Sequence, residues 1–143
     1  MPPTFKSAVH LFIIKNQQIL LLRRYNTGYE DGNYSVVAGH LNGSEKIVAA
    51  AIREAKEEVG INIQEKDVAI VQMMHRLSDD ERIDFFVTVS AWGGEVTNME
   101  PDKCDDLSWF PLDRLPDNTI PYVRQAIQNY QKDIPFTNFG WDG

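Results

Sequence analysis

The segment that most constrains the fold follows Gly39, where apolar side chains recur with the spacing of a helix. We predict a helix that runs from Ser44, a suitable N-cap residue, to Val59, with Gly60 as its left-handed C-terminal cap. The apolar positions are Val48, Ala51, Ile52, Ala55 and Val59. At about 100° per residue they form one face, so that face is expected to pack and the other is free for polar groups.

Runs of Val, Ile and Leu on both sides of this helix indicate strands. The predicted strands are residues 8–14, 18–24, 34–38, 68–74, 83–92 and 107–110, and a second helix is predicted at residues 120–130. The first two strands form a hairpin around the polar turn at residues 15–17. Strands, helix, strands and helix in this order predict the α/β class, with a mixed β-sheet in an α/β/α sandwich.

Length and composition predict one globular domain over residues 1–143. Hydrophobic residues make up 43 % of the chain and charged residues 24 %, which is the balance of a folded protein rather than a disordered one. No apolar run approaches the roughly 18 residues of a membrane span. The N-terminal Met1-Pro2-Pro3 lacks the basic and apolar regions of a secretory signal, so a cytoplasmic location is expected.

The charge and the cysteine content limit the partners and metals that we expect. The formal net charge of −7 argues against a nucleic-acid polymer or an anionic membrane as partner, because both need basic patches. A single cysteine excludes an intramolecular disulfide and any multi-cysteine zinc site. A metal would therefore be held by oxygen atoms or a few His, and the expected partner is a small molecule. The protein is expected to be a monomer or a homodimer.

Three carboxylates, those of Glu54, Glu57 and Glu58, lie within roughly 100° of arc on the predicted helix. A solvated acidic face is the ordinary explanation for such a group. However, Glu54 and Glu58 are like charges four residues apart. Glu57 and Glu58 also lie in the last turn, where the helix dipole disfavours each anion by about 0.3–1 kcal/mol. This arrangement favours a hard divalent cation that is coordinated by oxygen and neutralises the carboxylates.

Residues 39–61, GHLNGSEKIVAAAIREAKEEVGI, resemble the Nudix box, the sequence motif of the Nudix hydrolase family. The residues that match its fixed positions are Gly39, Glu45, Arg53, Glu54, Ala55, Glu57, Glu58, Gly60 and Ile61. A looser similarity extends through the preceding strands and residues 109–116. The resemblance implies the Nudix fold, an α/β/α sandwich, in agreement with the order of predicted elements.

The resemblance also implies an enzyme that hydrolyses the pyrophosphate bond of a nucleoside diphosphate derivative with Mg²⁺, or with Mn²⁺ in its place. The implied metal ligands are the Gly39 carbonyl and the side chains of Glu54, Glu57 and Glu58. Arg53 resembles the residue that holds the Glu side chains in register, a task suited to its planar fork of donors. We expect the catalytic residues to be Arg53, Glu54 and Glu57 of the motif, together with Glu100 on a later loop. Glu45 resembles a residue with a structural role.

The general base and the substrate-binding residues are less defined by the motif. The base is either a Glu of the motif or an acid on a later loop, where Glu95 and Glu100 both qualify and we favour Glu100. Either side chain could equally be a solvated loop charge. Arg23 and Arg24 end the second predicted strand beside the expected site, and one of them is expected to bind phosphate or sugar. The ordinary alternative is again a surface charge.

Three hypotheses about function remain open. The first is hydrolysis of a nucleoside triphosphate, including an oxidised one, to the monophosphate and pyrophosphate, because the short chain resembles the compact mutator-type pyrophosphohydrolases. The second is cleavage of a nucleotide sugar such as ADP-ribose. The third is a module that binds a nucleotide without hydrolysis, and the complete set of carboxylates argues against it. The identity of the base does not follow from the sequence, because specificity depends on loops.

Overall fold

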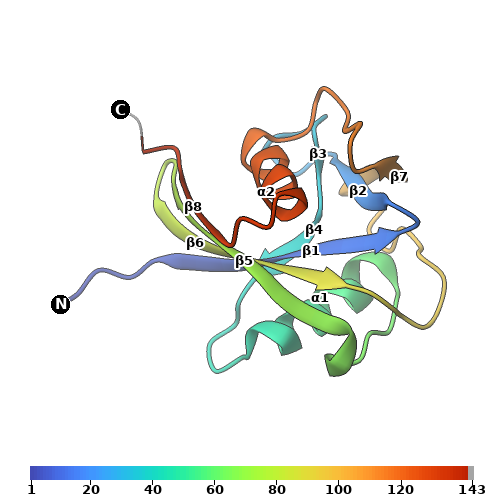
Figure 1. The fold of residues 1–143 in the computed structure, drawn as a ribbon, viewed down its shortest axis with the longest axis horizontal. Helices are drawn as coiled ribbons and strands as arrows, with labels where there is room; N and C mark the ends of the chain where they lie inside the picture. The colour runs from blue at the N-terminus through green and yellow to red at the C-terminus, as the bar shows by residue number, and fades with distance from the viewer. Residues whose placement is uncertain (142–143) are drawn as a thin grey trace.

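The computed structural model describes residues 1–141 and shows a mixed β-sheet with a helix on each side (Figure 1). The strands are β1 (Lys6–Lys15), β2 (Gln18–Arg24), β3 (Tyr34–Ser35), β4 (Val37–His40), β5 (Val68–Leu77), β6 (Glu81–Val89), β7 (Cys104–Pro111) and β8 (Phe136–Phe139). The helices are α1 (Ile47–Val59), α2 (Pro121–Gln131) and the short 3-10 helix η1 (Glu65–Asp67). The predicted α/β/α sandwich with a mixed sheet is confirmed.

Strand β1 organises the sheet because it pairs along both of its edges. It runs antiparallel to β4 and parallel to β6, so that Val9 has Gly39 as its partner on one side and Phe85 on the other. Strand β5 then joins β6, and β8 joins β5 at the edge of the sheet. At the other end of β1, Asn16 and Gln17 have positive φ angles of 54° and 63°, as a tight hairpin turn requires. The chain thereby enters β2, which pairs with β3 and β7.

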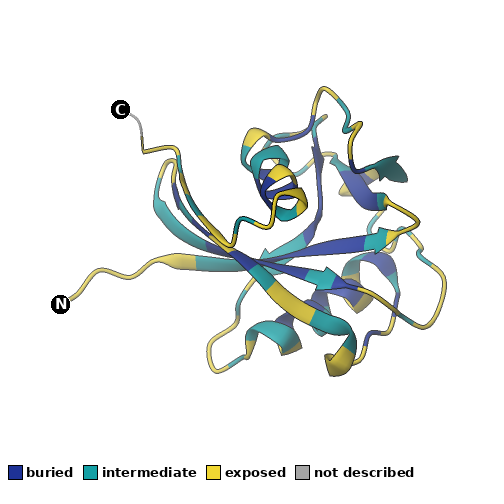
Figure 2. Cartoon of the chain, in the orientation of Figure 1, coloured by how far each residue is buried: buried dark blue, intermediate teal, exposed yellow. Residues whose placement is uncertain are grey.

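Side chains of β1 point alternately to the two faces of the sheet, so this strand contributes to two cores. Val9, Leu11 and Ile13 are fully buried in the core beneath α1. Phe12 is buried in the core beneath α2, where its ring centroid lies 5.4 Å from that of Phe86 on β6. Figure 2 shows the buried residues along the middle of the strands, between the two helices. Burial of both faces explains why the sequence shows continuous apolar runs here instead of alternation.

Helix α1 begins later than predicted. Ser44 has a φ of 61° and is not the N-cap, a position that Lys46 occupies in extended conformation without a side-chain hydrogen bond. The chain before the helix instead turns Glu45 so that its carboxylate accepts a hydrogen bond from the Asn42 backbone N–H at 2.9 Å. The C-terminal end is as predicted, with Gly60 at a φ of 71°. No helix within residues 1–141 is long and apolar enough to cross a membrane.

Two strand predictions differ from the structure for reasons of long-range packing. The strand predicted at residues 34–38 is divided between β3 and β4, because residues 34–35 pair with β2 whereas residues 37–40 pair with β1. Strand β8 was not predicted, since it is short and forms by pairing with the distant strand β5. The strands predicted at residues 83–92 and 107–110 are present with shifted ends, as β6 and β7.

A pair of phenylalanine variants tests this assignment of the cores. Phe86 is fully buried, whereas Phe136 on the edge strand β8 is 45 % exposed. Phe86→Ala should lower the free energy of unfolding by about 3–5 kcal/mol, because it removes buried apolar surface and leaves a cavity. Phe136→Ala, the matched control, should cost about 1 kcal/mol or less. Urea denaturation followed by circular dichroism measures both values, and equal losses would contradict the placement of Phe86 in the core.

Candidate functional site

A cavity of about 560 Å³ opens beside the edge strand β4. This volume is within the range of small-molecule binding sites. Its walls come from α1, α2, β1, β2, β4, β5, β6, the loop after β2 and the segment before β7. Because β4 lies at an edge, the cavity reaches residues on both faces of the sheet, including Glu54 of α1 and His10 of β1, which contacts α2. We call the part that contains Gly39, Glu54, Glu57, Glu58 and Glu100 the carboxylate lobe.

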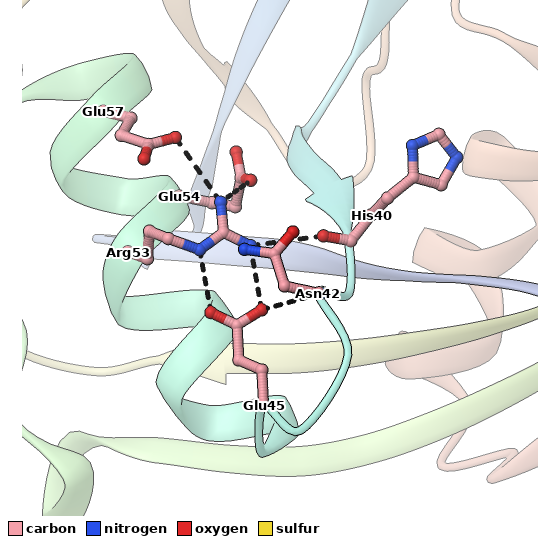
Figure 3. Close-up of polar contacts among 6 residues, drawn as sticks. All are labelled: His40, Asn42, Glu45, Arg53, Glu54 and Glu57. Atoms are coloured by element: carbon pink, nitrogen blue, oxygen red, sulfur yellow. Dashed lines mark hydrogen bonds and ion pairs between the residues drawn. The ribbon is translucent and has the colours of Figure 1, made fainter.

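Arg53 is the centre of the hydrogen bonds that join α1 to the loop after β4 (Figure 3). Its Nε and Nη2 donate to the two carboxylate oxygens of Glu45 at 2.8 and 3.0 Å. Its Nη1 donates to Glu54 Oε1 at 2.6 Å and lies 3.5 Å from Glu57 Oε2. Nη2 also donates to the His40 carbonyl oxygen at 3.2 Å. The planar guanidinium thus holds three Glu side chains and the main chain in one arrangement.

The electrostatics of this group keep Glu45 ionised. Hydrogen bonds from Arg53, together with one from the Asn42 backbone N–H, lower the pKa of Glu45 to about 2. Glu45 and Glu54 in turn raise the pKa of Arg53 above its ordinary value. Glu45 is not among the residues that line the cavity. It therefore supports Arg53 instead of meeting a ligand directly.

Gly39 allows α1 to approach β4 closely. A β-carbon at this position would overlap the Glu54 carboxylate, which occupies the space that a side chain of residue 39 would take. The helical spacing of the sequence predicts that the carboxylates of Glu54, Glu57 and Glu58 lie away from the apolar face of α1. In the structure Glu54 is buried together with Ala51 and Ala55, because Gly39 leaves room for it beneath the strand.

Glu58 carries a buried oxygen without a partner. Its Oε2 forms no hydrogen bond within residues 1–141, and no salt bridge to Glu58 is present among them. Burial raises the pKa of Glu58 well above its ordinary value, and the neighbouring Glu54 and Glu100 carboxylates raise it further. A cation at this point would offset the unfavourable burial of negative charge.

The carboxylate lobe has the chemistry of a site for a divalent cation. Its donors are oxygen atoms, the ligands that Mg²⁺ and Mn²⁺ prefer, and Glu58 retains a free oxygen close to Glu54. Glu57 is directed toward Arg53 and its side chain is 56 % exposed. Within the described part of the chain, no group of three or more His, Cys, Asp or Glu side chains is arranged to hold a metal ion. The Gly39 carbonyl, Glu54, Glu57 and Glu58 remain the predicted ligands.

The structure separates the remaining predicted site residues. Glu100 lines the cavity, whereas Glu95 is exposed and does not. Arg24 also lines the cavity, but Arg23 does not and instead pairs through Nε with Asp105 Oδ1 at 2.7 Å. The reason is that successive side chains of β2 point to opposite faces of the sheet. Of each predicted pair, one residue lines the cavity, namely Glu100 and Arg24.

Sequence analysis missed several polar residues of the cavity, among them four that come from β1, β5, β6 and α2. They are His10, Arg76, Asp84 and Tyr122, and we call them the polar lobe. Arg76 Nε donates to Asp84 Oδ2 at 2.7 Å, and both residues are almost completely buried. Asp84 could have revealed this group from the sequence, because it is a charged residue inside the apolar run at residues 83–92. A charge in a buried strand needs a partner of opposite charge.

The chain is similar to a described protein family and to named proteins. A family profile described as NUDIX domain matches residues 4–130. The NAD-capped RNA hydrolase NudC of Stutzerimonas stutzeri (strain A1501) is 28 % identical over 131 residues, which cover 90 % of this chain and 43 % of that protein. The ADP compounds hydrolase NudE of Escherichia coli (strain K12) is 26 % identical over 117 residues, which cover 82 % of this chain and 62 % of that protein. The chain thus spans less than half the length of the NudC relative.

Solved structures share the fold. A MutT NUDIX hydrolase from Burkholderia pseudomallei superposes with a TM-score of 0.80 at 24 % identity, covering 88 % of this chain and 98 % of that one. A MutT protein from Methanosarcina mazei Go1 gives a TM-score of 0.78 at 19 % identity, covering 93 % of this chain and 97 % of that one. At these identities the similarity concerns the fold alone.

The close approach of α1 to β4 is tested by an alanine at Gly39. The added β-carbon should displace the Glu54 carboxylate and lower the free energy of unfolding by about 1–3 kcal/mol, as overpacking does. Gly43→Ala is the matched control, because nothing lies within 4 Å of a β-carbon there, and its effect should stay within about 0.5 kcal/mol. Thermal melts with a chelator present compare the two variants. Indistinguishable melts would show that α1 does not contact β4 as described.

The Glu45–Arg53 contact predicts a pH dependence of stability. The pKa of Glu45 is lowered from 4.5 to about 2 in the folded protein, so its stabilising effect is present above about pH 4.5. That stabilising effect is lost as the pH falls from about 4.5 to about 2. The melting temperature of the wild type should therefore fall more steeply between about pH 5 and pH 2 than that of Glu45→Gln. Parallel curves would mean that Glu45 has no such partner in solution.

Proposed function

The chain belongs to the NUDIX family, and on that premise we propose that it hydrolyses the pyrophosphate bond of a nucleoside diphosphate derivative. The observation that carries the proposal is the pair of Glu54, which is buried against Gly39, and Glu58, which lies near it at the wall of the cavity. Glu58 Oε2 is buried and has no hydrogen-bond partner within residues 1–141, which favours a divalent cation. A pyrophosphate is a ligand that binds such a cation strongly through its own oxygens.

The side chains around the carboxylate lobe have distinct proposed roles. The proposed ligands of Mg²⁺, or of Mn²⁺ in its place, are the Gly39 carbonyl and the carboxylates of Glu54, Glu57 and Glu58. When bound, the cation offsets the charge that grows on the phosphoryl oxygens and lowers the pKa of water. Arg53 holds Glu54 through Nη1 and is a positioning residue, because it touches the carboxylate and not the proposed substrate.

Glu100 is the proposed general base. It lines the carboxylate lobe from the segment before β7 and lies close enough to Glu58 to raise the pKa of that group. The Asn98 side chain accepts a hydrogen bond from the Glu100 backbone N–H at 3.0 Å, which orders the turn. A carboxylate at this position can accept a proton from water as the bond from oxygen to phosphorus forms. Arg24, at the end of β2, is the proposed contact for the phosphates or the sugar.

Two substrate classes fit this site. The relatives are named for NAD-capped RNA and for ADP compounds, which favours a nucleoside diphosphate joined to a second organic group. A nucleoside triphosphate, the class favoured by the sequence, is the second candidate, because Arg24 and Lys103 both line the cavity and can bind an additional phosphate. The net charge of −7 argues against extended contacts with an RNA chain.

Metal dependence and product analysis test the proposal. Turnover should require Mg²⁺ or Mn²⁺ and stop in excess chelator, because all the proposed ligands are oxygen donors. A triphosphate should give the monophosphate and pyrophosphate, and ADP-ribose should give AMP and ribose 5-phosphate. Chromatography of the products measures both. Release of orthophosphate alone, or full turnover in chelator, would refute the proposed reaction.

A pair of charge-neutralising variants locates the reaction in the carboxylate lobe. Glu57→Gln should lose most of its turnover and still fold, since its exposed carboxylate contributes little to packing. Glu95→Gln, on an exposed residue outside the cavity, should keep wild-type turnover. Wild-type turnover by Glu57→Gln would show that the reaction takes place outside the carboxylate lobe. Binding of nucleotide without turnover by the wild type would instead support a nucleotide-binding module.

A further inference from the structure

The polar lobe lies on the α2 side of the sheet, and its polar groups are unusually deep. His10, Arg76 and Asp84 are only 2 %, 5 % and 1 % exposed, and all three line the cavity together with Tyr122. Buried polar groups of this kind are stable only when their hydrogen-bonding capacity is used. The hydrogen bonds within the polar lobe therefore show which donors and acceptors remain free to bind a ligand.

Most of the lobe is internally satisfied. Arg76 Nε donates to Asp84 Oδ2, and the Arg76 guanidinium lies 3.7 Å from the centroid of the Tyr122 ring. The Tyr122 hydroxyl is 3.1 Å from His10 Nε2. Two buried atoms, Asp84 Oδ1 and His10 Nδ1, have no hydrogen-bond partner within residues 1–141. His10 Nε2 lies 3.9 Å from Asp84 Oδ1, beyond hydrogen-bonding distance.

The charges in the lobe favour a neutral ligand. Arg76 is paired with Asp84, and Arg82, which also lines the cavity, is paired with Asp80 at 2.7 Å. Arg24 has no carboxylate partner within residues 1–141, and its Nε and Nη2 donate to the Tyr29 carbonyl and the Thr27 hydroxyl of the loop after β2. His10 is uncharged near neutral pH, because burial lowers its pKa to about 4. A phosphate at the free oxygen of Asp84 would bring two anionic groups together, which is unfavourable. A neutral group that donates a hydrogen bond satisfies that oxygen.

The shape of the lobe favours a planar group. The His10 ring lies between aromatic neighbours, with its centroid 4.7 Å from that of Phe86 and 5.6 Å from that of Tyr122. Tyr29, on the loop after β2, also lines the cavity, and the Arg24 guanidinium lies over its ring at 5.2 Å. The Tyr29 side chain is 47 % exposed, so part of its ring remains free for a planar heterocycle to stack on. A nucleobase supplies both the plane and the N–H donors.

We propose that the polar lobe binds the base of the substrate, and that Asp84 Oδ1 accepts a hydrogen bond from an amino group of that base. Asp84 is then a specificity-determining residue, and Arg76 and Tyr122 are positioning residues that hold its carboxylate and the His10 ring. This inference rests on the proposed function, because it takes the substrate to be a nucleotide. It adds the requirement that the base carries an amino group.

Pairs of nucleotides that differ only in the amino group test the inference with the wild-type protein. GTP is compared with ITP, and ATP with purine riboside triphosphate, in the presence of Mg²⁺. A base without the amino group leaves the buried oxygen unpaired, so kcat/KM should fall on the order of tenfold or more for at least one pair. Calorimetric titration with the corresponding monophosphates in chelator should show the same preference, because it requires neither metal nor turnover.

A matched pair of variants assigns the preference to Asp84. In Asp84→Asn, Arg76 Nε keeps the amide oxygen at the Oδ2 position, so the amide NH₂ replaces the free acceptor with a donor. The preference for the amino-bearing base should fall to parity or reverse. Asp106→Asn makes the same change in a carboxylate outside the cavity, which is bonded to the Tyr34 and Ser108 hydroxyls, and should keep the wild-type preference. Thermal melts establish that both variants fold.

The outcomes separate this inference from the proposed function. If the wild type hydrolyses no nucleotide, the proposed function fails and the inference falls with it. If the wild type hydrolyses nucleotides but shows equal kcat/KM for both members of each pair, the proposed function stands and the inference is overturned. The same equal values are expected if only water occupies the polar lobe. A preference that survives in Asp84→Asn would overturn the assignment to Asp84. If that variant does not fold, the wild-type comparison and the monophosphate titrations decide.

Discussion

Helix α1 meets strand β4 at Gly39, and the missing side chain there leaves space for the Glu54 carboxylate against the strand. Arg53 then fixes that carboxylate through Nη1 and is itself held by Glu45 through two further hydrogen bonds. The position of the acidic helix relative to the cavity depends on this contact. Packing and hydrogen bonds already hold this carboxylate in place, so it needs little reorganisation to bind a ligand. Effective sites are built in this way, from side chains that are fixed on rigid elements.

The edge position of β4 gives the cavity two chemically different ends. On the α1 side, acidic groups gather around Glu58, whose buried Oε2 has no hydrogen-bond partner within residues 1–141. On the α2 side, Arg76 and Asp84 pair with each other beside the Tyr122 ring. A molecule with a charged pyrophosphate and a neutral heterocycle matches this division. The same fold can then serve different substrates by changing the residues of one end only, because function depends on the site and not on the fold.

The site conflicts with local stability at Glu58. Glu58 lies in the last turn of α1, near Glu54 and Glu100, and burial together with these neighbours raises its pKa. The end of α1 and the start of α2 follow the usual preferences, with Gly60 in the left-handed C-cap of α1 and Pro121 at the first position of α2. Departures from local preference that have no structural compensation are expected at functional sites.

The sequence by itself determined the α/β class, the two helices, most of the strands and the motif that carries the carboxylates, because periodicity and spacing are local properties. Tertiary structure decided the features that depend on distant partners. It buried Glu54 under β4, joined Asp84 to Arg76 across neighbouring strands and added β8 beside β5. It also directed Arg24 and not Arg23 to the cavity. Neighbouring residues of a strand point to opposite faces of the sheet, but only the packing of the sheet decides which face borders the cavity.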